Sequence, residues 1–237
     1  MSIILIMLVD NIQSAPGKIG KRASTLDTHP LRSLIGDFLA ALQELEKGPI
    51  TTARLSAFLA EMRPSAKALA PYVLWNSQRY ARNLIYRDAL FEVLALCWLP
   101  GQQTPIHTHN GQLGWVTIVQ GELVCRDYRF VRAPRDTQSR EREFASRPYF
   151  SSRSRRVEVE LVASTTCAAD GRVTVVDRQQ TTHQLANVEG SRHGTVSLHV
   201  YSKPIDRCVL FDEISRCWER RQLQYHSVEG TILNDAA

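Results

Sequence analysis

The chain has 237 residues, of which 43% are hydrophobic, and 29 Lys and Arg against 24 Asp and Glu give it a formal net charge of +5. This is enough apolar material for one sizeable core. The basic excess is concentrated in residues 132–156, without a motif that reads nucleic acid. We therefore expect a solvated basic loop there and rank nucleic-acid binding last among the possible functions.

Five cysteines are present, an odd number without a Cys-x-x-Cys pair, which favours reduced thiols in a cytoplasmic protein over a disulfide framework. The apolar run at residues 1–9 is too short to span a bilayer and lacks a basic flank and a clear cleavage site. We expect no membrane association, and we interpret residues 1–28 as a flexible N-terminal extension.

Two helices are predicted next, within a helical preface over residues 29–75. Leucines, Ile35 and Phe38 recur at helical spacing from residue 31 to 45, and Gly48-Pro49 ends that helix. Thr51 or Thr52 can cap a second helix, which Pro64 ends or kinks. The side chains that it is expected to bury are Leu55, Phe58, Leu59 and Met62.

From about residue 80 the pattern changes to short β-like runs, which favour a sandwich or small barrel over residues 76–230, with a tail at 231–237. Turn signals at Pro100-Gly101, Asn110-Gly111, Gln120-Gly121 and Asp170-Gly171 separate several runs. The predicted strands cover residues 80–86, 91–98, 114–119, 122–130, 157–163, 172–176, 183–188 and 196–202, with another near 222–226.

His107 and His109 flank Thr108, and residues i and i+2 of a strand project from one face. Two imidazoles side by side form half of a metal site, and His183 begins a later β-like run that can bring a third. The alternative is that the three are separate polar residues that satisfy hydrogen bonds.

The spacing of glycines around these histidines resembles the two motifs of cupins, which implies a jelly-roll barrel with its metal at the mouth. The usual Glu ligand after the second His is missing, because Leu113 and Gly114 occupy its positions. The site would then contain three neutral imidazoles, a set that alone does not select the metal. The matching residues are Gly101, His107, His109, Gly114, Gly121, His183 and Asn187.

Ser197, His199 and Tyr201 form a second alternating row, with Leu198 and Val200 on the opposite face. Such a row can be a hydrogen-bond relay that ends in a phenol, or polar residues on a solvated sheet face. Nothing marks Ser197 as the nucleophile of a hydrolase.

Together these blocks closely resemble the cysteine dioxygenase family, over about residues 30–230. The matching blocks are Arg79-Tyr80-Ala81-Arg82-Asn83-Leu84, Leu96-Cys97-Trp98, Pro105-Ile106-His107-Thr108-His109, Gln120-Gly121-Glu122-Leu123, His183 with Asn187, and Ser197-Leu198-His199-Val200-Tyr201-Ser202. More weakly, Asp206-Arg207-Cys208 and Tyr225-His226-Ser227 match as well.

The resemblance implies a mainly β fold, a cupin barrel after two or three N-terminal helices. It also implies one Fe(II) per chain, held by His107, His109 and His183, and oxidation of L-cysteine by O2 to cysteine sulfinic acid. The other implied roles are carboxylate binding by Arg82 with Tyr80 beside it, hydrogen bonding by Tyr201, orientation of Tyr201 by His199 and Ser197, and lining of the pocket by Leu96 and Trp98.

Two departures from the family matter. Animal members have a Cys at the position of Gly114 that is crosslinked to the tyrosine, so no such crosslink to Tyr201 is possible here. Lys203 replaces a common proline, so no Ser-Pro cis bond is expected at that step.

Two alternatives stay open: a dioxygenase of another small thiol (3-mercaptopropionate, cysteamine or mercaptosuccinate), and a metal-binding cupin without catalysis. We expect a small thiol and O2 as partners, and a monomer or weak oligomer.

Overall fold

A computed structural model of the chain describes residues 30–109, 111–132, 158–176 and 182–233. The expected N-terminal extension at 1–28 and nearly all of the basic stretch at 132–156 lie outside the described residues, so these two predictions stay untested.

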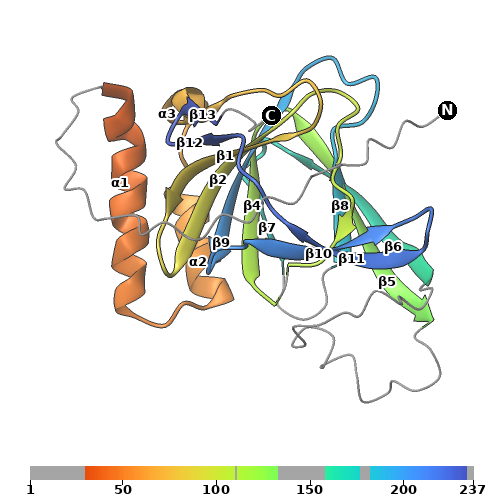
Figure 1. Ribbon diagram of the computed structural model, residues 1–237. Coiled ribbons are helices and arrows are strands. Elements are labelled where there is room, and N and C mark those ends of the chain that lie inside the picture. Colours follow the sequence, from red (N-terminus) through yellow and green to blue (C-terminus); the bar gives the residue numbers. More distant parts are fainter. Residues whose placement is uncertain (1–29, 110, 133–157, 177–181, 234–237) are drawn as a thin grey trace.

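Helices come first in the chain, as predicted, and pack on one face of a sheet (Figure 1). The Thr51 side chain caps the second helix by accepting from the Arg54 N–H at 3.2 Å. The expected burial of Met62 is wrong: it lies one residue beyond the helix end and is 37% exposed. Among the described residues, no helix is long and apolar enough to cross a membrane. The helical elements are α1 (Pro30–Glu44), η1 (Leu45–Lys47), α2 (Thr52–Glu61), α3 (Ala66–Leu69) and η2 (Ala70–Tyr72).

Two sheets make up the rest, which confirms the mainly β jelly-roll fold with N-terminal helices; hydrogen bonds do not close the sheets into one barrel. The first has the order β13 (Thr231–Ile232), β12 (Ser227–Val228), β1 (Ala81–Arg87), β2 (Phe91–Trp98), β9 (Thr195–Ser202), β4 (Leu113–Gln120) and β7 (Val173–Val176). The second has the order β11 (Cys217–Gln222), β10 (Arg207–Asp212), β3 (Ile106–His107), β8 (Thr182–Ala186), β5 (Glu122–Arg132) and β6 (Glu158–Ala168).

The strand predictions fail mainly near the C-terminus. The strand expected near 222–226 is wrong, because β11 ends at Gln222 and β12 begins at Ser227. The β10–β11 hairpin was missed, since the Cys-Trp-Glu-Arg-Arg-Gln sequence of β11 has no clear alternation of apolar and polar residues. Thr231–Ile232, in the range expected to be a tail, pair with β12.

The alternation of side chains along β2 and β9 divides the core in two. Odd-numbered Phe91 and Val93 and even-numbered Leu198 and Val200 face the helices, where Leu42, Leu55 and Leu59 pack against the sheet. The opposite faces of the same strands point into the space between the sheets. That inner face contributes Leu94, Leu96, Trp98 and Tyr201, which pack with Ile118, Leu123 and Leu185.

Candidate metal centre

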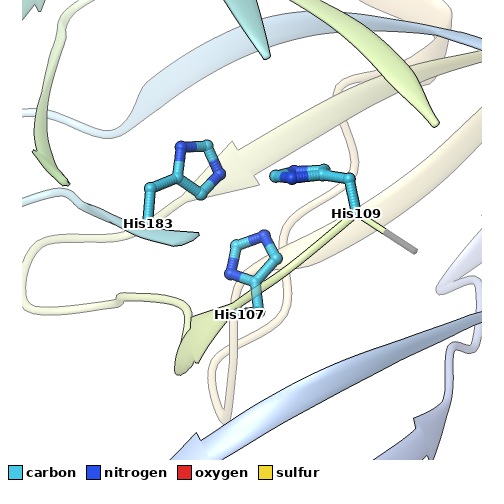
Figure 2. A group of neighbouring side chains, drawn as sticks. All are labelled: His107, His109 and His183. Atoms are coloured by element: carbon cyan, nitrogen blue, oxygen red, sulfur yellow. The ribbon is translucent and has the colours of Figure 1, made fainter. Parts of the chain in front are cut away.

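The three histidines of the sequence prediction converge on one point between the strands (Figure 2). His107 in β3 pairs directly with His183 in β8. Their ring centroids are 4.8 Å apart, and the His109 ring lies 4.9 Å from His107 and 4.7 Å from His183. The expectation that both members of the His107–His109 pair lie on a strand is wrong, because β3 ends at His107 and His109 follows two residues later.

The chemistry of these side chains fits a metal ion. One ring nitrogen from each lies within 4.8 Å of the others. Burial, followed by the charge of Arg82, lowers the pKa of His107 to about 4, and burial holds the pKa of His183 well below its usual value. Both are therefore neutral at pH 7 and offer lone pairs, as a metal ligand must.

The individual nitrogens support the same conclusion. His107 Nδ1 lies 3.0 Å from the Pro105 carbonyl oxygen and donates to it, which leaves Nε2 as the nitrogen with a lone pair. His183 Nε2 is buried and has no hydrogen-bond partner among the described residues. A buried unsatisfied nitrogen is costly, and a bound cation relieves that cost.

The other nitrogen of His183 faces a thiol. Its Nδ1 lies 3.8 Å from Cys125 Sγ, which in turn lies 3.8 Å from a carboxylate oxygen of Asp127. Burial raises the pKa of Cys125 to about 12, so the sulfur is protonated at neutral pH. A protonated thiol is a poor metal ligand, so these contacts are better understood as support for the His183 ring.

A continuous hydrogen-bond chain runs along β9 beside the histidines. Trp98 Nε1 donates to Ser197 Oγ at 2.9 Å, Ser197 Oγ lies 2.9 Å from His199 Nε2, and His199 Nδ1 lies 3.0 Å from Tyr201 Oη. All four side chains are buried. The structure therefore brings the predicted Ser197, His199 and Tyr201 together as a relay and rejects a solvated row.

The donor inventory gives this relay a direction. An indole N–H can only donate, so the Ser197 hydroxyl accepts from Trp98. His199 Nε2 is the other hydrogen-bond partner of this buried hydroxyl among the described residues, so the hydroxyl hydrogen is directed to it. Burial, with the nearby charge of Arg82, lowers the pKa of His199 to about 3, so the ring is neutral and its hydrogen sits on Nδ1. Tyr201 Oη accepts that hydrogen, which leaves its own O–H to be donated elsewhere.

Tyr201 stands next to the histidine cluster. Its ring centroid lies 6.0 Å from that of His109 with an interplanar angle of 28°. Burial raises the pKa of Tyr201 well above its usual value, so the phenol keeps its proton.

The backbone turn after Tyr201 agrees with the replacement of a proline by Lys203. Lys203 has a φ of +73°, which proline cannot adopt, and its N–H donates to the Leu90 carbonyl at 2.7 Å.

Arg82 lies on β1, directly opposite Leu96 on β2. Its guanidinium lowers the pKa of both His107 and His199, which puts the positive charge near the histidine cluster. Nε and Nη2 of Arg82 are buried and have no hydrogen-bond partner among the described residues. Tyr80, just before β1, stacks on Trp98 with ring centroids 4.6 Å apart.

Two neighbours of Arg82 were missed from the sequence. The Glu92 carboxylate lies 3.6 Å from Nη2, and the Tyr225 ring centroid lies 5.6 Å from Cζ. A signal for Glu92 was present, since it is the one charged residue in the apolar run Phe91–Trp98. Tyr225 belonged to a weakly matching block of the family resemblance, but nothing in the sequence linked it to Arg82.

Solved structures that match part of this chain include TT1209 from Thermus thermophilus and a protein with a double-stranded beta-helix domain from Klebsiella pneumoniae. The first has a TM-score of 0.37 at 15% identity and covers 57% of this chain and 93% of that one. The second has a TM-score of 0.38 at 14% identity and covers 61% of this chain and 95% of that one.

Sequence relatives are more informative. Cysteine dioxygenase type 1 of Rattus norvegicus is 22% identical over 198 residues, and that of Homo sapiens is 23% identical over 198 residues; each match covers 83% of this chain and 88% of the relative. The family model for cysteine dioxygenase type I matches residues 32–214. The match includes all three histidines, Arg82 and the relay. The chain therefore belongs to the cysteine dioxygenase type I family.

Proposed function

We propose that this protein is an iron-dependent dioxygenase that oxidises L-cysteine with O2 to cysteine sulfinic acid. The observation that carries the proposal is the juxtaposition of three converging imidazoles with a buried guanidinium whose Nε and Nη2 have no hydrogen-bond partner among the described residues. Family membership supports the reaction class, and the residues of this chain support the choice of substrate.

His107, His109 and His183 would hold the ion. Their donor set contains no carboxylate, so it leaves the charge of a divalent cation to be balanced by incoming anions such as a thiolate. When bound, Fe(II) supplies the redox-active centre at which the substrate sulfur and O2 react. His109 and His183 are buried and His107 is half-buried, which limits the access of water to that centre.

Arg82 would bind the substrate carboxylate. The Nε and Nη2 donors form the side-on edge of a guanidinium, which matches the two oxygens of a carboxylate. Because these donors are buried, a carboxylate gains a charge-assisted pair there without competition from bulk water. This requirement favours thiols that carry a carboxylate over those that do not.

Tyr201 would donate a hydrogen bond either to the substrate or to the oxygen atom that is transferred to the substrate sulfur. The relay from Trp98 through Ser197 and His199 ends on the Tyr201 oxygen as an acceptor, so the phenol proton is left for another acceptor. The raised pKa of Tyr201 makes it a hydrogen-bond donor rather than a base at neutral pH.

The overall reaction balances without another reductant. A thiol RSH and one O2 give RSO2H: two S–O bonds form, the O–O bond breaks, and sulfur loses the four electrons that dioxygen gains. The protein residues bind and orient both substrates, and they are unchanged at the end of the cycle.

The test is a thiol panel on protein loaded anaerobically with Fe(II). Oxygen uptake and sulfinate mass are measured with L-cysteine, 3-mercaptopropionate, mercaptosuccinate and cysteamine, for the wild type and for Arg82→Gln. We expect L-cysteine to have the highest kcat/KM and Arg82→Gln to reduce it by about 30-fold or more. The matched control is Arg129→Gln, which removes a guanidinium from an exposed pair with Glu160.

Other results have clear meanings. If the enzyme prefers another thiol, the proposed substrate is wrong but the proposed reaction class stands. Bound iron without oxygen uptake for any thiol would instead indicate a metal-binding protein without catalysis and would end the proposal.

A further inference from the structure

Glu92 is a carboxylate in an unusual place. It lies in β2 with no solvent exposure, and it is the register partner of Tyr201 on β9. Its side chain points to the inner face of the sheet, as those of Leu94 and Leu96 do. A buried acidic side chain is expensive unless charges and hydrogen bonds compensate it.

The compensation comes from four groups. The Tyr225 hydroxyl donates to one oxygen of Glu92, and the Ile205 N–H donates to the other at 3.3 Å. Arg82 Nη2 lies 3.6 Å away and Arg87 Nη1 lies 3.8 Å away.

Arg87 in turn is tied to the chain around it. It donates to Asp206 at 2.7 Å and to the Tyr225 hydroxyl at 2.6 Å. The two arginines and two carboxylates therefore balance in charge, and the cluster links β1 and β2 to the segments that contain Asp206 and Tyr225.

Seen from Arg82, these groups hold the guanidinium on two sides. Arg82 Cζ lies over the Tyr225 ring, 5.6 Å from its centroid, and Glu92 lies beside Nη2. The 3.6 Å separation is too long for a hydrogen bond, so Glu92 attracts the guanidinium without using its hydrogens. Nε and Nη2 thus stay available to another acceptor.

We infer that Glu92 is a positioning residue, which holds Arg82 so that its Nε–Nη2 edge is presented to the substrate carboxylate. This inference rests on the proposed function. A pair of apolar residues would fill the same volume at equal or lower cost to stability, so a buried ion pair is weak evidence for a purely structural role. The pair would instead serve binding, because an Arg82 side chain that is already held in the right orientation loses less freedom when the substrate carboxylate binds.

The variant for the test is Glu92→Gln, which keeps the shape and an oxygen acceptor for Tyr225 but removes the charge. The dissociation constant of L-cysteine is measured by anaerobic calorimetry on Fe(II)-loaded wild type, Glu92→Gln, Arg82→Gln and the double variant. We expect Glu92→Gln to weaken binding by between about 3-fold and 30-fold, which lies within the range found for coupled neighbours. In the Arg82→Gln background the same change should have no further effect.

The second part of the test repeats these binding measurements with cysteamine, a thiol that lacks a carboxylate. Its dissociation constant should be the same in wild type and Glu92→Gln, because the role of Glu92 acts through the carboxylate. A merely structural role would weaken both thiols alike. The control variant is Glu160→Gln, which removes an exposed carboxylate paired with Arg129 and should change neither constant.

Three results overturn the inference. They are equally weakened binding of both thiols, effects of Glu92→Gln and Arg82→Gln on the dissociation constant that multiply in the double variant, and tighter binding of L-cysteine by Glu92→Gln. The last would mean that Glu92 competes with the substrate for the guanidinium. Wild type that forms no sulfinate with any thiol would instead reject the proposed function itself, so the two failures are distinguishable.

Discussion

Gly114 on β4 lies directly opposite Tyr201 on β9, and a Cβ atom at position 114 would stand 2.7 Å from Cε1 of the tyrosine ring. No real Cβ approaches a ring carbon so closely, so the absence of a side chain allows the observed ring position.

Gly114→Ala should therefore displace the Tyr201 ring and lower kcat. Displacement of a catalytic group by about 1 Å can cost up to about 100-fold, and we expect a loss of at least about 10-fold. Steady-state oxygen uptake measures it. Gly36→Ala is the control, since nothing lies within 4 Å of a Cβ there, and it should keep full activity. Full activity of Gly114→Ala would show that the position of Tyr201 is unimportant.

The relay can be tested through two tryptophans that share the same chemistry. Trp98 and Trp115 are both fully buried and each donates to a serine hydroxyl, Trp98 to Ser197 at 2.9 Å and Trp115 to Ser56 at 3.1 Å. Changing either to Phe should reduce the free energy of unfolding by at least about 1 kcal/mol, because one hydrogen bond is lost and the smaller ring leaves a cavity.

Only Trp98→Phe should also reduce kcat, because only Trp98 sets the direction of the relay to Tyr201. Urea unfolding and oxygen uptake on the same samples separate the two effects. Equal activities of the two variants would remove Trp98 from the relay.

Acid should destabilise the metal-free protein in part through His199. Burial lowers the pKa of His199 from 6.5 to about 3, so the unfolded chain binds the proton more readily. The resulting stability is present above pH 6.5 and is lost as the pH falls from 6.5 towards 3. Fully developed, a shift of this size corresponds to roughly 5 kcal/mol.

His199→Gln removes that titration. The curve of unfolding free energy against pH should therefore be flatter for His199→Gln than for wild type in this window, although His107 and His183 still titrate. Parallel curves would show that His199 does not contribute.

Part of the candidate site was predictable because its residues lie at strand spacing, as the i, i+2, i+4 row of Ser197, His199 and Tyr201 does on β9. The His107–His109 pair predicted two of the converging imidazoles, although β3 ends at His107. The turn predictions worked for a local reason: Gly101, Gly111, Gly121 and Gly171 all have positive φ.

What the sequence did not reveal depends on distant contacts. Trp98 enters the relay through β2–β9 pairing, which brings it beside Ser197 from 99 residues away. Glu92 meets Tyr225 across 133 residues, and no local pattern records that approach. The start of β3 and its early end at His107 follow from pairing with β8 and β10 rather than from the propensity of two residues.

The decisive comparison is of iron binding and sulfinate formation between wild type and His183→Ala. We expect about one iron per wild-type chain and one sulfinate per O2 consumed with L-cysteine, and loss of both iron and product in His183→Ala while the fold is retained by circular dichroism. Oxygen uptake and sulfinate formation by His183→Ala at the wild-type rate would contradict it.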